Sequence, residues 1–545
     1  MRISDIRLIN YKIFEGLFSL KLNSGMNILV GDNEAGKSTI IEAVNLALSG
    51  LVGGRYIKNE LSQYLFNNNV VEAYFAQLRD TGSAELPYVL IELYLEGDDT
   101  ARFMGNDNSQ GINSCGIFMK IAFDEKYQAE YEELVKVDNF NTLPLEYYDV
   151  FWGSFAREAV TARSIPLKAA LIDSSSARFQ NGSDVYISRI IKDLLNTEDI
   201  VAASQAHRRM RDVFNEDKSI ITINEKIKEA ADVSSKEVRL SVDLSSKNAW
   251  ETTLLTYFDD VPFHHIGKGE QSMVKTKLAL SHSKSKEANI ILVEEPENHL
   301  SHTKLSQLVK YISAKRDDKQ IIVSTHNSFV ANKLGLANLI LLNDGRTVRL
   351  NELSNDTQSY FAHLSGYDTL RLILCKKAIL VEGDSDELVV QRAYMTKHEG
   401  KLPIEDGVDV ISVGTSFLRF LEIASKINKP TTVVTDNDGS VDALKRKYTG
   451  YLGDNVKDNI LISFDDSIDT GSLKIKDKPF NYNTLEPKML KVNSLAKFNT
   501  VFGTSYSDND SMHKFMLSNK TKCALKIFET NENIIYPKYI MDAVN

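Results

Sequence analysis

The sequence predicts a multidomain α/β protein. Short apolar runs of strand length alternate with helical patterns in two blocks, residues 1–350 and residues 375–545. A polar, charged stretch with helical periodicity interrupts the first block from about residue 165. At 545 residues the chain is too long for one hydrophobic core, and a usual domain size divides it into about three or four units. We therefore expect two α/β domains, the first of them split by a helical insert.

The order of these patterns defines five segments. Ile28 to Val30 is expected to be a buried strand, and Lys37 to Leu48 has the periodicity of a helix. After a polar helical stretch, a new alternating series begins with the apolar run that ends at Val381. The expected segments are residues 1–164, an N-terminal lobe; residues 165–235, a helical insert; residues 236–350, a second lobe; residues 351–374, a helical linker; and residues 375–545, a second domain with a parallel sheet.

Composition limits the environment and the partners of the chain. With 43% hydrophobic residues and only 10 prolines, the composition is typical of a folded protein. Lys and Arg total 64 against 74 Asp and Glu, so the net charge of −10 repels a polyanion unless a local basic patch or a bound metal intervenes. Three scattered cysteines without a CxxC pair fit a reducing compartment, and no apolar run approaches the ~20 residues that cross a bilayer. We expect a cytoplasmic protein without membrane contact.

The segment Gly31 to Ser38, GDNEAGKS, matches the phosphate-binding pattern GxxxxGKS. It stands between an apolar strand and an apolar-periodic helix, which is the context that the pattern requires. In such a loop the backbone N–H groups face the phosphates, the lysine reaches the β and γ oxygens, and the hydroxyl ligates Mg²⁺. The residues expected to bind ATP here are Gly31, Asn33, Gly36, Lys37, Ser38 and Thr39.

Further candidates for the ATP site lie after residue 265. The apolar run Ile290 to Val293 ends in Glu294, expected to hold the Mg²⁺ shell, and Glu295, expected to activate water. His326 follows another apolar strand, at the place of a sensor of the γ-phosphate. Gly269 lies in the segment GKGEQ before an apolar helix, where a helix N-terminus can read a phosphate.

The order of these motifs resembles the SMC and OLD (overcoming lysogenization defect) branch of the ABC ATPases. In that family a Walker A loop, a long insertion, a signature, a Walker B strand, a D-loop and a His switch follow one another. Many members carry Asp where this chain has Glu294. The resemblance implies a head-to-head homodimer with composite ATP sites, in which residues 165–235 are a dimerisation element and higher assembly is open. Gln63 and Gln77 are alternative candidates for the Q-loop residue.

Two strands of the second domain end in carboxylates. Glu382-Gly383 follows an apolar strand, and Asp386 comes four residues after Glu382. About fifty residues later, Asp436 and Asp438 lie at positions i and i+2, on one side of a strand end. A strand followed by Glu-Gly and then a strand followed by Asp-x-Asp is the Toprim pattern. Like charges this close are tolerated when a divalent metal neutralises them.

With an ABC-type module ahead of it, the Toprim pattern resembles the OLD nucleases over nearly the entire chain. The resemblance adds a downstream glutamate, Glu486, and a late catalytic lysine, Lys520. It implies two Mg²⁺ or Mn²⁺ ions that clamp a scissile phosphate, with Lys520 offsetting charge on that phosphate and Glu382 among the catalytic groups. The expected metal ligands, not divided between the two ions, are Glu382, Asp386, Asp436, Asp438 and Glu486.

Basic groups for DNA binding are expected just after the Asp-x-Asp strand. They are Lys445, Arg446 and Lys447, which are favoured over the arginines near residue 210 because they lie close to the metal ligands in sequence. The resemblance implies an ATP-regulated, metal-dependent DNA endonuclease that acts in bacterial anti-phage defence.

Two other functions and two partner sets stay open. One alternative is a nucleic-acid sensor, clamp or DNA-repair ATPase whose Toprim-like domain does not cut; the other is topoisomerase or primase chemistry. The resemblance includes effectors encoded with retrons, with a reverse transcriptase and an RNA-linked DNA as partners, and Gabija-type nucleases with a helicase-like partner. A retron origin is slightly favoured because the ATPase motifs look complete.

Overall fold

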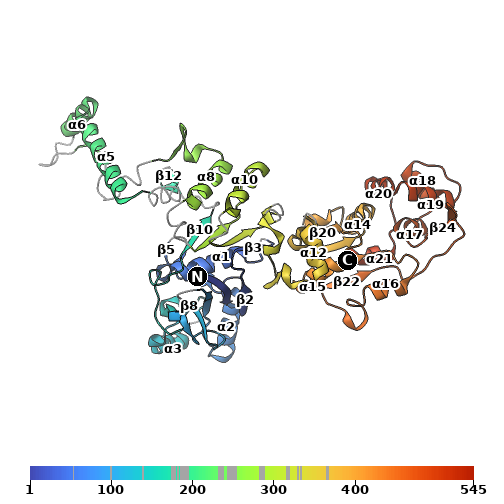
Figure 1. Ribbon diagram of the computed structural model, residues 1–545, viewed down its shortest axis with the longest axis horizontal. Coiled ribbons are helices and arrows are strands. Elements are labelled where there is room, and N and C mark those ends of the chain that lie inside the picture. Colours follow the sequence, from blue (N-terminus) through green and yellow to red (C-terminus); the bar gives the residue numbers. More distant parts are fainter. Residues whose placement is uncertain are drawn as a thin grey trace. The chain divides into compact units, whose positions relative to one another are not determined.

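The structure is a computed structural model of the full chain (Figure 1). The structure describes residues 1–32, 34–52, 55–97, 101–137, 140–173, 179–180, 183–184, 195–230, 239–241, 255–281, 289–314, 319–327, 330–331, 334–363 and 367–545.

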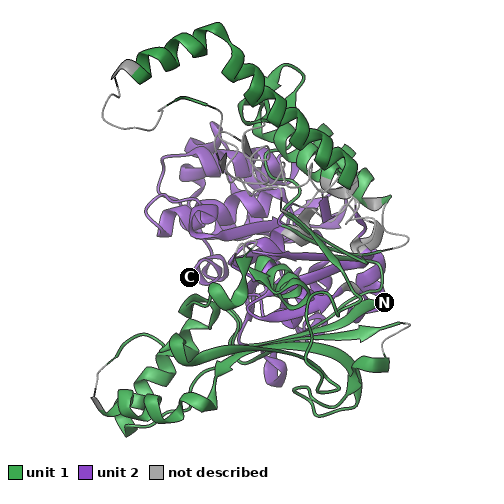
Figure 2. Ribbon diagram, turned by 90° about the vertical axis from the view of Figure 1, so that its left-hand side faces the viewer, with its two compact units in different colours: residues 1–27, 38–325 green, residues 28–37, 326–545 purple. Residues whose placement is uncertain are grey.

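Two compact units make up the chain (Figure 2). The first consists of residues 1–27 and 38–325, and the second of residues 28–37 and 326–545. The phosphate-binding loop therefore lies where the chain passes from one unit to the other. Each unit is described by itself.

An antiparallel sheet forms much of the first unit, in the order β2-β1-β6-β8-β7 with β9 paired to β8. The buried residues of β1 are Ile3, Ile6 and Leu8, which do not fit a strict two-residue alternation. A register shift between Ile3 and Asp5 solves this conflict, because a bulge turns the next side chain to the same face. The strands are β1 (Arg2–Ile9), β2 (Leu17–Lys21), β6 (Val89–Glu96), β7 (Met104–Gly105), β8 (Ser114–Phe123) and β9 (Tyr148–Ser154).

Three parallel strands of the first unit include the one that ends in Glu294. They are β10 (Ala169–Asp173), β15 (Ile290–Glu294) and β16 (Gln320–Thr325). The strand β15 is buried from Ile290 to Val293, as its unbroken apolar run predicts. The strand β10 corrects an expectation, because helix was expected from residue 165. The five residues AALID are too few to form a stable helix, and they pair with β15 instead.

Helices of the first unit include two that the sequence analysis did not identify. These are α2 (Asn68–Thr81), which Asn67 caps and Gly82 ends, and α3 (Gln128–Val137). The expected helix after the phosphate-binding loop is α1 (Lys37–Ser49), and those beside the parallel strands are α8 (Lys268–Ser281) and α10 (His302–Ser313). Within the expected insert, the described residues form α5 (Thr197–Glu216), which starts with a capping box of Asn196 and Asp199, and α6 (Lys218–Ala230).

The second unit begins with the strand that leads into the phosphate-binding loop. This strand, β3 (Met26–Gly31), pairs in parallel with β17 (Leu339–Asn343), which pairs antiparallel with β18 (Arg346–Arg349). The segment expected to be a helical linker forms α12 (Asn355–His363) and α13 (Tyr367–Leu374). Packing between α12, α13 and the following domain includes the rings of Phe361 and Phe420, which meet edge to face.

A four-stranded parallel sheet forms the core of the C-terminal domain. Its order is β20-β19-β21-β22, so the chain leaves the central pair β19 and β21 in opposite directions. Ligands of parallel α/β domains bind outside the carboxyl ends of the strands at such a switch point. The strands are β19 (Lys377–Val381), β20 (Val408–Ser412), β21 (Thr431–Val434) and β22 (Ile460–Ser463).

Helices cover this sheet, and no described helix of the protein is long and apolar enough to cross a membrane. The helix α14 packs on both α20 and β20, and α21 packs on β21 and β22. A small hairpin of β23 (Lys474–Ile475) and β24 (Lys478–Pro479) precedes the last helices. The helices are α14 (Asp384–Lys397), α15 (Phe417–Lys426), α16 (Val441–Lys447), α17 (Leu485–Val492), α18 (Leu495–Phe502), α19 (Asn509–Ser518), α20 (Lys520–Glu529) and α21 (Lys538–Ala543).

The packing of β3 against β17 predicts a steric cost for Gly31→Ala. A Cβ atom at Gly31 would lie 2.5 Å from the carbonyl oxygen of Leu342, which is backbone and cannot move aside cheaply. We expect the free energy of unfolding to fall by about 2 kcal/mol, measured by urea denaturation. The control is Gly450→Ala, where nothing lies within 4 Å of the added atom. Equal stability of the two variants would contradict this packing.

Candidate functional site

The phosphate-binding loop connects β3 to α1 through a left-handed turn at Gly36, whose φ is 87°. Lys37 is buried, and its Nζ donates hydrogen bonds to the carbonyl oxygens of Gly31 at 2.9 Å and of Asp32 at 2.8 Å. Ser38 is exposed and Thr39 is buried in the first turn of α1, while Asn33 lies outside the described residues. The amine is thus held at the loop, where it can exchange these carbonyl contacts for phosphate oxygens.

Glu294 and Glu295 lie at the carboxyl end of β15, in the first unit. Glu294 is the last strand residue, in register with Asp173 on one side and Ser324 on the other. Glu295 has a positive φ of 39°, a conformation that costs energy for a residue with a side chain. Its N–H donates to the carbonyl oxygen of Ser324 at 3.1 Å, and its Oε2 accepts from Asn298 Nδ2 at 3.0 Å. These contacts fix the carboxylate that is expected to activate water.

Gly269 lies in the first turn of α8, against the turn that follows Glu295. A Cβ atom there would lie 2.3 Å from the carbonyl oxygen of His299, so only glycine allows this approach. His299 itself has a positive φ of 63°. The sequence suggested Gly269 as part of a signature segment, and the structure adds a packing reason for the glycine.

The remaining candidates for the ATP site are His326, Gln63 and Gln77, which differ in exposure and in their hydrogen-bond partners. His326 directly follows β16 and is exposed. Gln63 Oε1 accepts from the backbone N–H of Leu143 at 3.0 Å, so it already has a structural partner. Gln77 is exposed on α2. Both glutamines remain candidates for the Q-loop residue.

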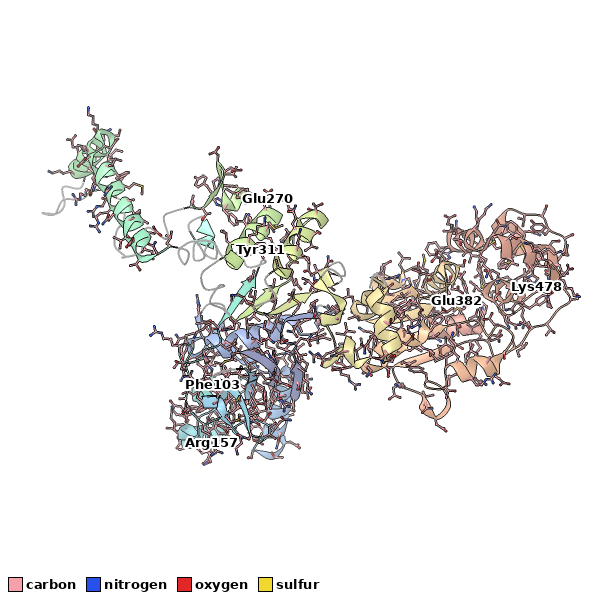
Figure 3. All side chains as sticks on the ribbon, viewed as in Figure 1. Phe103, Arg157, Glu270, Tyr311, Glu382 and Lys478 are labelled. Carbon is pink, nitrogen blue, oxygen red and sulfur yellow. The ribbon has the colours of Figure 1, made fainter. Side chains whose placement is uncertain are left out.

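A second group of acidic side chains gathers at the switch point of the C-terminal sheet. Glu382 is the first residue after β19, and Asp436 is the second residue after β21 (Figure 3 labels Glu382). Because β19 and β21 are neighbouring parallel strands, their carboxyl ends meet at one edge. Asp386 comes from the first turn of α14, and Glu486 from the first turn of α17. Four separate elements thus supply carboxylates to this edge.

The electrostatics of this edge follow from burial and from like charges. Burial, together with the charges of Glu486 and Glu382, raises the pKa of Asp386 to about 6. Burial also raises the pKa of Asp436 well above its ordinary value, and the charges of Asp386, Asp438 and Glu486 add to this effect. The sequence therefore places negative charges where the fold alone disfavours them.

Hydrogen bonds orient two of the carboxylates, and an ion pair contacts a third. Asp386 Oδ2 accepts from the N–H of Gly383, and Asp436 Oδ2 accepts from the N–H of Leu485, each at 3.1 Å. Lys520, the first residue of α20, places its Nζ 3.4 Å from Glu486 Oε2. The lysine side chain is 46% exposed, so this contact leaves much of its ammonium group open to a ligand.

Hard carboxylate oxygens of this kind suit Mg²⁺ or Mn²⁺. Within the described residues, no group of three or more Asp, Glu, His or Cys side chains is already arranged as a metal site. The donor set, which consists of carboxylates, fits a divalent metal in its chemistry. The residues that would hold the metal are Glu382, Asp386, Asp436, Asp438 and Glu486.

Sequence reasoning missed the residues that support the Asp-x-Asp loop. The buried Asn437 donates from Nδ2 to the carbonyl oxygens of Asp465 at 2.5 Å and Ser467 at 2.9 Å. Asn481 Nδ2 donates to Asp438 Oδ1 at 3.1 Å. The sequence signal for these residues was the polar pattern Asn481-Tyr-Asn ahead of Glu486. This pattern lies too far from Asp438 in the chain to be linked to that residue without the fold.

A buried lysine holds the neighbouring loop. Lys488 is 3% exposed, and its Nζ lies 2.8 Å from Asp465 Oδ2 and 2.7 Å from Asp469 Oδ2. It also donates to the carbonyl oxygen of Ser467 at 2.9 Å. Because Asn437 binds the same loop, Lys488 and Asn437 together fix the segment behind the Asp-x-Asp turn.

The basic residues expected to bind DNA form the last turn of α16. Lys445, Arg446 and Lys447 are all exposed there. Lys447 Nζ lies 5.2 Å from the ring centre of Phe417, which restricts its side chain more than those of its two neighbours. Their use in DNA binding stays a prediction.

Comparison with known proteins matches one family to the N-terminal part of the chain and another to a later part. A family described as "AAA domain" matches residues 5–365, and one described as "Overcoming lysogenization defect protein-like, TOPRIM domain" matches residues 373–438. Among solved structures, "Crystal structure of the SmcHead bound to the C-winged helix domain of ScpA" is 14% identical, with 65% of this chain and 99% of that chain covered. The TM-score of this match is 0.35.

Curated relatives match over short stretches. "Retron Ec83 probable ATPase" of Escherichia coli is 32% identical over 135 residues, covering 22% of this chain and 23% of the relative. "DNA replication and repair protein RecF" of Clostridium novyi (strain NT) is 46% identical over 44 residues, covering 8% and 12%. The chain thus spans less than a quarter of the length of these relatives. The family model that matches residues 5–365 shows that this chain belongs to the AAA domain family, and an OLD-like TOPRIM domain follows that region.

Proposed function

We propose that the protein is an ATP-regulated, divalent-metal-dependent DNA endonuclease that acts as an effector in bacterial anti-phage defence. The observation that carries the proposal is the gathering of carboxylates from β19, β21, α14 and α17 at one sheet edge. A binding module gains nothing from buried charges that repel one another, whereas phosphodiester hydrolysis needs metal ligands.

The carboxylates would hold the metal ions, and Lys520 would act on the phosphate of the substrate. Bound divalent ions supply an activated water and stabilise the leaving oxygen of a phosphodiester. Asp386 and Asp436 hold their orientation through the N–H groups of Gly383 and Leu485. Lys520 lies beside Glu486, where its charge can offset negative charge on the phosphate.

Contacts inside the second unit support regulation by ATP. The strand β17 pairs with β3, which leads into the phosphate-binding loop, and its Asn343 donates from Nδ2 to the carbonyl oxygen of Ile427 at 2.9 Å. Ile427 caps the end of α15. Just before α15 begins, the N–H of Gly414 donates to the carbonyl oxygen of Glu382 at 3.1 Å. One helix therefore links the strand beside the ATP loop to a proposed metal ligand.

The proposed assembly is a homodimer formed through the ATPase head and the helical insert. The helices α5 and α6 support it, because they expose apolar side chains that a partner would cover. These are Val201, Met210, Val213, Ile221 and Ile223. The relative named as a retron ATPase favours a reverse transcriptase and an RNA-linked DNA as further partners over a helicase-like one.

A nucleic-acid sensor or clamp that does not cut is the second candidate function. It is favoured by the RecF relatives, which are named for DNA replication and repair. Plasmid cleavage distinguishes the two functions.

We expect the purified protein to nick or linearise plasmid DNA with Mg²⁺ or Mn²⁺. Asp436→Ala should lower the cleavage rate by about a hundredfold or more, because it removes a central metal ligand. Lys37→Ala, assayed with and without ATP, shows whether nucleotide drives or restrains cleavage. Asp454→Ala, at an exposed aspartate outside the cluster, is the control. Intact ATP hydrolysis without cleavage by the wild type would instead support the sensor.

For the ATPase itself, Glu295→Gln should slow hydrolysis by about 10²-fold to 10⁴-fold while ATP binding persists. The carboxylate is the expected base, and the amide keeps its size and the contact with Asn298. Phosphate release and binding of a fluorescent nucleotide measure the two properties. A loss of binding together with hydrolysis would assign Glu295 to a structural role.

The raised pKa of Asp386 predicts a pH-dependent cost in metal-free protein. Its folded-state value of about 6 exceeds the ordinary 3.8, so the fold favours the protonated acid. The penalty is absent below the unfolded value, grows between the two values and is complete above about 6. Two pKa units at about 1.4 kcal/mol each give about 3 kcal/mol.

Asp386→Asn should therefore stabilise the metal-free protein at pH 8 and have little effect at pH 4. Thermal unfolding in EDTA at both pH values measures this, and the difference between variant and wild type cancels the titrating groups that do not interact with Asp386. Mg²⁺ or Mn²⁺ should raise the melting temperature of the wild type more than that of the variant. A variant less stable than the wild type at pH 8 would refute the assigned charge repulsion.

A further inference from the structure

A lysine-rich hairpin precedes the segment that contacts Asp438 of the carboxylate cluster. The strands β23 and β24 pair antiparallel, and Lys476 and Asp477 connect them. Lys474, Lys476 and Lys478 are exposed, so the tip carries a charge of about +2 in a protein of net charge −10. Figure 3 shows Lys478 at the outer edge of the C-terminal domain.

The turn of this hairpin is strained. Lys476 has a φ of 51° and Asp477 a φ of 62°, a left-handed pair for which Asn-Gly is the favoured sequence. The side chain of Lys476 is exposed and gains no burial that would offset the strain. In the described chain, none of the three ammonium groups has an ion pair or a side-chain hydrogen bond. Within the described chain, the three ammonium groups are thus available to an anionic ligand.

The base of the hairpin is tied to the proposed metal site. The N–H of Phe480 donates to the carbonyl oxygen of Leu473 at 2.9 Å, which closes the hairpin. The next residue, Asn481, donates from Nδ2 to Asp438 Oδ1 at 3.1 Å. Three residues of extended chain separate Lys478 from Asn481, a span of at most about 11 Å. This distance corresponds to about three phosphates of one DNA strand at 3.4 Å each.

We propose that Lys474, Lys476 and Lys478 bind backbone phosphates of DNA beside the scissile bond. The proposal rests on the proposed nuclease function and deepens it. A cluster of carboxylates repels a polyanion, so the substrate strand needs compensating cations next to that cluster. Lysine ammonium groups contact phosphates as point charges and read no bases. The hairpin would therefore hold the strand over the carboxylates without sequence preference.

Two variants test the proposal without disturbing the fold. Lys474→Gln with Lys478→Gln removes two charges, and Lys476→Asn removes one while it places a favoured residue in the left-handed turn. The control is Lys397→Gln with Lys401→Gln. Lys397 ends α14, about 17 Å along the helix from Asp386. Melting temperatures should stay unchanged in all variants, or rise for Lys476→Asn.

Binding of duplex DNA is measured by fluorescence anisotropy over an approximately fourfold range of salt concentration, from about 50 to about 200 mM. All variants carry Asp436→Asn in addition, so that Mg²⁺ can be present without cleavage of the DNA. Each lost phosphate contact should lower the slope of log affinity against log salt by about 0.9, so the double variant loses about 1.8 and Lys476→Asn about 0.9. The control should keep the wild-type slope. In the cleavage assay, the hairpin variants should raise KM while kcat changes little.

Unchanged slopes in the hairpin variants, or an equal loss in the control, would overturn the proposal. If the wild type cuts DNA and the hairpin variants cut it with unchanged KM, the hairpin proposal fails and the nuclease function stands. If DNA binding depends on the hairpin but no cleavage occurs under any condition, the nuclease function fails and phosphate binding by the hairpin stands.

Discussion

Charge repulsion at the carboxyl edge of β19 and β21 is the constraint around which the C-terminal domain is built. The backbone topology alone brings Glu382 and Asp436 to that edge, because parallel neighbours end on the same side. Helices α14 and α17 then add Asp386 and Glu486, and burial raises the pKa values of Asp386 and Asp436. A fold selected only for stability would place apolar or paired groups there. The surplus charge is stable only with a cation or a proton.

The surroundings of the cluster fix its position without neutralising it. Asn437 and Lys488 both bind the loop of residues 465–469, so the turn between Asp436 and Asp438 is held from behind. Lys488 forms ion pairs with Asp465 and Asp469 rather than with the carboxylates of the cluster. Only Lys520 contacts a cluster carboxylate among the described ion pairs, and that contact is long and exposed. The network therefore supplies rigidity and leaves the negative charge for a ligand.

Sequence reasoning succeeded where chemistry and chain order coincide. The strand ends at Gly31, Glu294, Glu382 and Asp436 were predictable because an apolar run followed by a polar pattern marks the edge of a parallel sheet. It failed where a residue's role depends on a distant partner. The need for glycine at 269 comes from the carbonyl of His299, thirty positions away. Likewise β10 is a strand because β15 pairs with it, although its sequence is short and lies in a helical context. A local sequence pattern does not show which distant residue will be the partner.

The two candidate sites differ in how their charges are satisfied before a ligand arrives, and this difference suggests how one can govern the other. Lys37 already has carbonyl partners in its own loop, so its ammonium group is satisfied before a phosphate replaces them. At the carboxylate edge, by contrast, burial and like charges raise the pKa values of Asp386 and Asp436, so the negative charge there lacks such compensation. Asn343, Ile427 and Gly414 connect β17 to Glu382 through α15, so a shift of the strand beside the phosphate-binding loop would be transmitted toward the carboxylate edge. Such a coupling acts equally in both directions, so a nucleotide that strengthened metal binding at the carboxylate edge would itself bind more tightly in the presence of the metal.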